Sequence, residues 1–118
     1  MIGVDIIEID RIAKLINKDF LNTFFTDKEK EYIITKNNSA QTVAGLFSAK
    51  EAISKALGIG LGNGVKLNEM EIDHDIMGKP IVVLYGEAKE ELAKYGKEIE
   101  ISISHNKTSA IAFALIKV

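Results

Sequence analysis

The stretch QTVAGLFSAKEAISKALG, from Gln41 to Gly58, decides the fold of this 118-residue chain. Its many alanine and leucine residues favour a helix, and Gly58 is typical of the residue that ends a helix in a left-handed conformation. At about 100° per residue, Leu46, Ile53 and Leu57 share one face of this helix and define a buried stripe. We therefore expect a long central helix against which the rest of the chain packs.

Three charged residues of this helix are candidates for chemistry. Lys50 falls inside the apolar stripe, although a lysine can lay its stem on apolar surface and keep its ammonium group in water. Glu51 and Lys55 lie one turn apart on the flank of the stripe, where an ordinary i,i+4 ion pair would also explain them. The glycine-rich residues 58–64 follow directly. Their backbone N–H groups suit an anion-binding nest, although a simple connector would use the same glycines.

Outside the central helix, the chain alternates between short helices and strands. The local signals predict a strand at residues 2–9, a short helix from Asp10, a helix from Asp27 to about Lys36 that starts at the capping box Thr26 to Glu29, a hairpin of residues 69–74 and 81–85, a helix at residues 87–95, and an antiparallel pair of residues 98–104 and 109–116. The fold class is therefore α+β, a single domain with a small antiparallel sheet and a long central helix.

Composition and charge narrow the possible functions. Fifteen Lys and Arg against 17 Asp and Glu give a net charge of −2, so no general basic field attracts nucleic acid. The absence of cysteine excludes disulfides, iron–sulfur clusters and thiol nucleophiles. No apolar run reaches the roughly 20 residues that cross a bilayer, and acidic residues interrupt the apolar N-terminal segment. We expect a soluble cytoplasmic protein that binds neither nucleic acid nor membrane.

A few polar residues outside the central helix also invite a functional explanation. Asp5 interrupts an apolar strand, where a carboxylate needs a partner, a cation or solvent. His105 follows a strand, at a position that often holds binding residues. Its neighbour Ser104 is too close to serve as a nucleophile with His105 as base, and no G-x-S-x-G elbow is present, so a serine hydrolase is disfavoured. His74 lies between two aspartates, and we interpret it as part of a solvated hairpin shoulder rather than a metal site.

Three motifs occur in order along the chain: GVDIIEIDRI at residues 3–12, FSAKEAISKALG at residues 47–58 and ISISH at residues 101–105. Together they resemble the holo-acyl-carrier-protein synthase type of 4′-phosphopantetheinyl transferase, over nearly the whole chain. The resemblance implies a homotrimer with active sites between neighbouring subunits. It also implies an enzyme of fatty acid biosynthesis, which transfers the phosphopantetheine arm of coenzyme A to a serine of apo acyl carrier protein and releases adenosine 3′,5′-bisphosphate.

The resemblance assigns roles to eight residues, several of which the sequence alone singles out. It implies that Asp5 and Glu51 bind Mg²⁺, that Lys55 lies close to the pyrophosphate, that Ser104 and His105 line the coenzyme A pocket, that Gly62 approaches the phosphates, that Pro80 borders the adenine, and that Arg11 meets the acidic carrier protein. Glu51 and Lys55 are then the catalytic residues, with Glu51 as a candidate acceptor of the serine proton.

Two departures from the family pattern affect these expectations. Leu46 stands where relatives commonly have an arginine, so a phosphate contact is lost or comes from elsewhere. Asp19 lies in a segment that is usually more basic, which bears on the choice of carrier. Two other functions fit the same residue types: a non-catalytic adaptor that binds the carrier protein, and a different Mg²⁺-dependent nucleotide enzyme. The presence of Asp5, Glu51 and Lys55 together argues against the adaptor.

Overall fold

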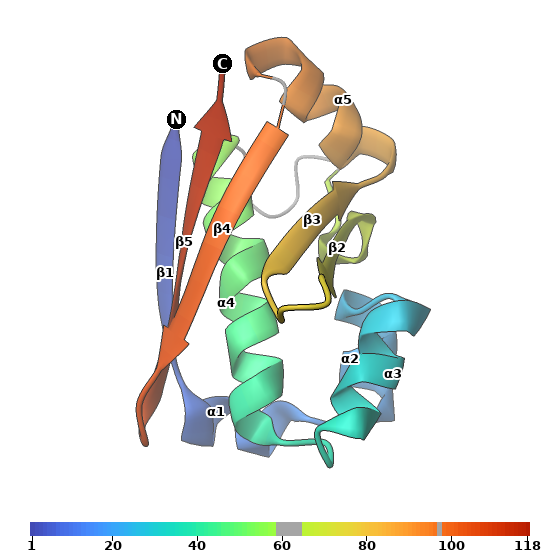
Figure 1. Cartoon of the computed structure of the whole chain (residues 1–118). Coiled ribbons are helices and arrows are strands. Elements are labelled where there is room, and N and C mark those ends of the chain that lie inside the picture. Colours follow the sequence, from blue (N-terminus) through green and yellow to red (C-terminus); the bar gives the residue numbers. More distant parts are fainter. Residues whose placement is uncertain (59–64, 97) are drawn as a thin grey trace.

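The computed structural model describes residues 1–58, 65–96 and 98–118. Its elements are β1 (Ile2–Glu8), α1 (Ile9–Leu15), α2 (Lys18–Phe24), α3 (Asp27–Thr35), α4 (Ala40–Ala56), the 3₁₀ turn η1 (Leu67–Glu69), β2 (Met70–His74), β3 (Pro80–Leu84), α5 (Gly86–Tyr95), β4 (Glu98–His105) and β5 (Ser109–Lys117). Helix α4 runs through the middle of the molecule, with a sheet on one side and the β2–β3 hairpin, α2 and α3 on the other (Figure 1). The predicted α+β class and long central helix are confirmed.

The main sheet has three antiparallel strands in the order β1-β5-β4. Successive side chains along each strand point to opposite sides, so the sheet has two different faces. The inner face, which packs on α4, carries small residues of β5 such as Ala112 and Ala114, both buried. The outer face is apolar but exposed, and its side chains are those of Ile2, Val4, Ile6, Ile111, Phe113 and Leu115. A sheet that exposes a row of large apolar side chains is a surface that a partner protein can cover.

Helix α4 approaches β1 so closely that only glycine fits at position 3. A Cβ atom on Gly3 would overlap the carbonyl oxygen of Ala52 and would lie 2.6 Å from the backbone nitrogen of Ala56. The helix meets β1 through its small residues Ala52 and Ala56, whereas the predicted stripe of Leu46, Ile53 and Leu57 lies about a quarter turn further around the helix. Helix α4 is therefore buried on two faces, and the sequence pattern revealed only the face with the large side chains.

Side-chain caps begin the three helices α2, α3 and α4. Thr26 and Glu29 form the reciprocal capping box at the start of α3, as predicted. Helix α2, in contrast, was not predicted from the sequence. The side chain of Asn17 caps it by accepting a hydrogen bond from the backbone N–H of Phe20 at 2.8 Å, and Phe20 packs against Phe24 and Phe47. Tertiary contact between aromatic rings thus stabilises a seven-residue helix that would be marginal alone.

Lys50 corrects an expectation from the sequence. Its side chain is completely buried rather than extended into solvent, and it forms an ion pair of 2.5 Å with Glu29, which is also buried. Burial lowers the pKa of Lys50 and raises the pKa of Glu29. The opposite charge of the partner partly offsets this effect of burial on each pKa. Because Lys50 is paired within the protomer, its position in the apolar stripe is no argument for an oligomer.

Among the described residues, no helix has the length and apolar character required to span a membrane.

The close contact between β1 and α4 generates a testable prediction. We expect Gly3→Ala to lower the free energy of unfolding by at least about 2 kcal/mol, because the backbone atoms that its Cβ meets cannot move aside. Gly58→Ala is the matched control, since a Cβ there meets none of the described residues within 4 Å and the positive φ of 72° is the unfavourable feature, at a cost of about 1 kcal/mol. Urea denaturation measures both, and equal losses would contradict the packing argument.

Candidate active site

Asp5, Glu51 and Lys55 meet at one edge of the main sheet. Asp5 lies on the inner face of β1, and its side chain is 17% exposed. The ammonium group of Lys55 is 3.2 Å from Asp5 Oδ1 and donates a hydrogen bond to the carbonyl oxygen of Val4 at 3.1 Å. In the part of the chain that the structure describes, no ion pair joins Lys55 to Glu51, so the ordinary i,i+4 pair is not the explanation of these residues.

The electrostatics of this cluster favour a bound cation. Burial and the nearby charge of Asp5 raise the pKa of Glu51 above its usual range, and Lys55 only partly offsets them. A carboxylate whose charge is disfavoured beside a second carboxylate is a natural site for a hard divalent cation. Among the described residues, no three or more His, Cys, Asp or Glu side chains are grouped so that they could hold a metal ion by themselves. An ion at Asp5 and Glu51 would therefore take its other ligands from water or from a substrate.

A separate cleft of about 540 Å³ lies on the other side of α4. The cleft is bounded by α3, by the first half of α4, by the β2–β3 hairpin and by β4. His105 and Pro80 both line this cleft. His105 is held there by Gln41, since the two side chains are hydrogen-bonded at 2.6 Å. The structure thus brings together two of the residues that the family resemblance assigned to the coenzyme.

The cleft also contains charged and aromatic groups that the sequence did not reveal. Lys36 and Lys79 line it, and Leu46 contributes an apolar patch. His74 lines it as well and stacks on Tyr32, with ring centroids 4.1 Å apart. His74 lies on the shoulder of the hairpin, as predicted, but its ring is half-buried against Tyr32 rather than fully solvated, and this burial lowers its pKa. Leu46 and His74 were singled out from the sequence for other reasons, whereas Tyr32, Lys36 and Lys79 meet in the cleft only through the fold, which is why sequence reasoning missed them.

The remaining predicted site residues lie elsewhere. Ser104 is exposed and lies on the outer face of β4, because side chains alternate along the strand and His105 is on the inner face. Arg11 is exposed on α1. Gly62 falls outside the described residues, as does most of the glycine-rich segment.

The acidic cluster and the cleft are on opposite flanks of α4. Thr42 lines the cleft, and Glu51 follows it by nine residues, which is half a turn beyond two full turns, or about 180° around the helix. In the sheet, β5 lies between Asp5 and His105, and their partners on β5 are two residues apart. At ordinary strand spacings, the two Cα atoms are therefore roughly 12 Å apart. Among the residues that the structure describes, the acidic cluster and the cleft therefore do not form one continuous site within a single protomer.

These features define a class of protein. A carboxylate pair suited to a divalent cation, a lysine beside it and a separate cleft lined by two more lysines together suit an enzyme that acts on a phosphorylated substrate.

Comparison with known proteins identifies the family. The model of the 4′-phosphopantetheinyl transferase superfamily matches residues 1–114. The holo-[acyl-carrier-protein] synthase of Clostridium botulinum (strain Eklund 17B) is 48% identical over 119 residues, which cover 99% of this chain and 96% of the relative. The chain belongs to the 4′-phosphopantetheinyl transferase superfamily, and its similar relatives are holo-[acyl-carrier-protein] synthases.

Solved structures agree with this assignment. The crystal structure of the Helicobacter pylori holo-[acyl-carrier-protein] synthase in complex with coenzyme A has a TM-score of 0.86 and 31% identity, covering 99% of this chain and 100% of that one. The Bacillus anthracis synthase, in complex with coenzyme A (3′,5′-ADP), has a TM-score of 0.80 and 35% identity, covering 98% and 93%.

Proposed function

We propose that this protein transfers the 4′-phosphopantetheine group of coenzyme A to a serine of apo acyl carrier protein, a step that serves fatty acid biosynthesis. The observation that carries the proposal is the cluster of Asp5, Glu51 and Lys55 in a chain that is similar to holo-[acyl-carrier-protein] synthases over almost its full length. The resemblance supplies the reaction, and the cluster supplies groups whose chemistry suits it.

The proposed reaction requires positioning and charge neutralisation more than covalent catalysis. The serine hydroxyl oxygen forms a bond to the phosphorus that carries the pantetheine arm, and the bond from that phosphorus to the bridging oxygen breaks. Adenosine 3′,5′-bisphosphate leaves with the bonding electron pair. Glu51 is the group placed to accept the serine proton. Lys55 stabilises the negative charge that develops on the leaving phosphate.

Asp5 and Glu51 are the residues that would hold Mg²⁺. Both offer the hard oxygen ligands that this ion prefers, and with only two protein carboxylates, most ligand positions are left to water and phosphate oxygens. Bound there, Mg²⁺ would supply Lewis-acid polarisation of the pyrophosphate. Lys55, 3.2 Å from Asp5 Oδ1, adds positive charge beside the same carboxylate.

The cleft beside His105 is the proposed site for the adenosine bisphosphate part of coenzyme A. Pro80 and the Tyr32–His74 pair provide flat surfaces for a purine, and Lys36 and Lys79 provide positive charge. These lysines take over the phosphate contact that Leu46 cannot make.

The separation of the cluster from the cleft supports a ring of subunits, which we propose to be a homotrimer. Among the described residues, β1 pairs only with β5, so its outer edge is open. A head-to-tail contact that brings the β1 edge of one subunit beside the cleft of the next would complete each site and would close into a ring. It would also cover the apolar outer face of the sheet. Ser104, on that face, would then lie at the subunit boundary.

The acidic carrier protein is proposed to dock near Arg11. Lys14 and Lys18 are exposed close to it in the sequence and contribute further positive charge. Asp19, also exposed, reduces the positive charge of this surface. Electrostatic attraction of this kind raises the rate of association and falls as salt screens it.

Transfer itself is the first test. Incubation with coenzyme A, Mg²⁺ and apo carrier protein is expected to increase the mass of the carrier by one phosphopantetheine group, measured by mass spectrometry. We expect Asp5→Asn and Glu51→Gln to lower the rate at limiting Mg²⁺ by at least about 100-fold, because each removes a charged ligand. Asp27→Asn, whose side chain is 98% exposed, is the control. Binding of the carrier without any mass change would indicate an adaptor, and transfer independent of both carboxylates would refute the assigned cluster.

Shared sites predict complementation. Light scattering is expected to give a mass of three protomers, and Asp5→Asn and His105→Ala subunits are each expected to be inactive alone. When they are mixed by reversible dissociation in equal amounts, about a quarter of the sites combine an intact cluster with an intact cleft, because each half comes from a different subunit. Activity that stays at the level of the separate variants would refute sites between subunits, as would a fully active monomer.

Carrier docking near Arg11 predicts a salt effect. We expect Arg11→Glu to raise the KM for the carrier several-fold at low salt, with an unchanged KM for coenzyme A, because only the docking surface is altered. The difference from the wild type is expected to shrink as salt rises. Lys94→Glu, on the distant α5, is the control. An equal KM for the carrier in wild type and Arg11→Glu would place the docking surface elsewhere.

A further inference from the structure

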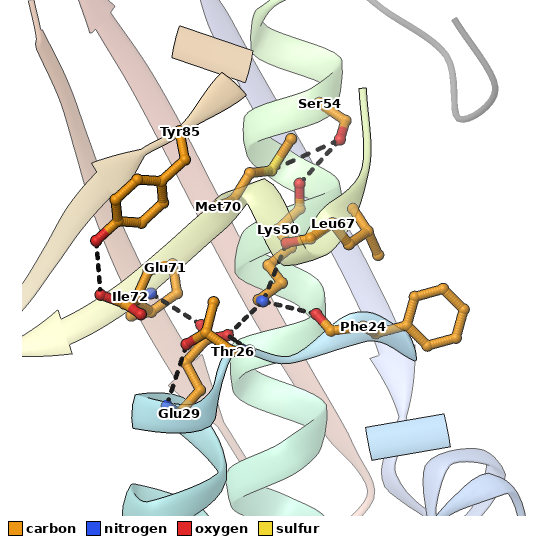
Figure 2. A network of polar contacts seen from close by, with 10 residues as sticks. All are labelled: Phe24, Thr26, Glu29, Lys50, Ser54, Leu67, Met70, Glu71, Ile72 and Tyr85. Atoms are coloured by element: carbon orange, nitrogen blue, oxygen red, sulfur yellow. Dashed lines mark hydrogen bonds and ion pairs between the residues drawn. The ribbon is translucent and has the colours of Figure 1, made fainter. Parts of the chain in front are cut away.

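Lys50 is the centre of a buried polar network that the proposed chemistry does not use. Its ammonium group donates to Glu29 Oε1, to the carbonyl oxygen of Phe24 at 2.7 Å and to the carbonyl oxygen of Leu67 at 3.1 Å. These three acceptors use all three N–H bonds of the ammonium group. One side chain from the middle of α4 therefore contacts the end of α2, the start of α3 and the turn η1 (Figure 2).

Glu29 extends the same network to the hairpin. Its Oε2 accepts a hydrogen bond from the backbone N–H of Ile72 in β2 at 2.8 Å, and its Oε1 accepts one from the backbone N–H of Thr26 at 2.9 Å. Figure 2 shows the carboxylate between Lys50 and these two backbone groups. The ion pair therefore connects α3 and β2 to α4 through hydrogen bonds of fixed direction.

The connected elements are the ones that form the cleft. Helix α3 supplies Lys36, the hairpin supplies Lys79 and Pro80, and α4 supplies Leu46. Lys50 follows Leu46 by one turn of α4, so the network lies directly beyond the part of the helix that lines the cleft. The closest backbone packing of α4 is with β1, β4, β5 and α1, whereas α3 packs closely on β2. The hairpin also packs on β4 through β3, so this contact and the side-chain network together set the position of α3 and the hairpin relative to α4.

A contribution to stability alone does not account for such a pair. Burying two charges costs about as much as their attraction returns, and apolar residues of similar volume often give equal or greater stability. What a buried ion pair with several backbone contacts adds is a defined geometry. We propose that Lys50 and Glu29 are positioning residues, which hold α3 and the β2–β3 hairpin at the distance from α4 that coenzyme binding requires. This inference rests on the proposed function of the cleft.

The test compares binding with turnover in Lys50→Met and in Glu29→Gln, which keeps the shape of the carboxylate. We expect each variant to raise the KM for coenzyme A about tenfold or more, with kcat at saturating coenzyme A within about threefold of wild type, because Asp5, Glu51 and Lys55 lie on another flank of α4. Calorimetric titration with adenosine 3′,5′-bisphosphate measures cleft binding without transfer, and its Kd is expected to rise by the same factor.

Lys28→Met is the matched control. Lys28 also links α3 to β2, through an ion pair of 2.7 Å with Asp73, but both side chains are partly exposed, at 60% and 36%. We expect less than a twofold change in KM and Kd, because exposed pairs hold their partners weakly. Circular dichroism and urea denaturation identify variants that are folded at the assay temperature.

Each outcome decides the proposal. A folded Lys50→Met or Glu29→Gln variant with wild-type KM and Kd would overturn it, as would a fall in kcat with unchanged KM. If neither variant folds, the pair is required for the fold as a whole and the positioning role is rejected. Failure of the proposed function is a different result, because wild-type protein would then show neither transfer nor binding of the bisphosphate.

Discussion

The close approach of β1 to α4 is the constraint on which the rest of the structure depends. Gly3 lies against the backbone of Ala52 and Ala56, and this distance decides where the next inward residue of the strand, Asp5, is placed. With a larger residue at position 3, the strand would move away from the helix, and Asp5 would lose its position beside Glu51. A packing requirement at a residue without a side chain thus sets the geometry of the acidic cluster.

The same helix separates two kinds of chemistry. One flank of α4 carries Glu51 and Lys55, which stay partly accessible and suit a cation and a phosphate. The other flank carries Thr42 and Leu46, which line the cleft with the cationic side chains of Lys36 and Lys79. In the proposed function, a second protomer brings the two flanks together around a substrate with two distant charged parts, so catalysis there depends on assembly.

The sequence predicted those features that local rules determine. The capping box at Thr26, the length of α4 and the two antiparallel pairs all follow from residues close together in the chain, and the structure confirms them. Helix α2 and the partner of Lys50 were missed, because they depend on contacts between residues far apart. Glu29 precedes Lys50 by 21 positions, and no periodic pattern indicates that the two side chains meet.

The contrast between Lys50 and Lys55 shows how one helix assigns opposite tasks to the same residue type. Lys50 is fully buried and donates to three acceptors of its own chain, so it has no N–H bond left for a substrate. Lys55 has a side chain that is 58% exposed, and it contacts Asp5 and one carbonyl oxygen. Its charge remains accessible to an incoming phosphate, and a cation that replaced it at Asp5 would free it further. A lysine whose N–H bonds all donate to protein acceptors holds parts of the structure together. A lysine that shares its partner with a ligand can take part in the reaction.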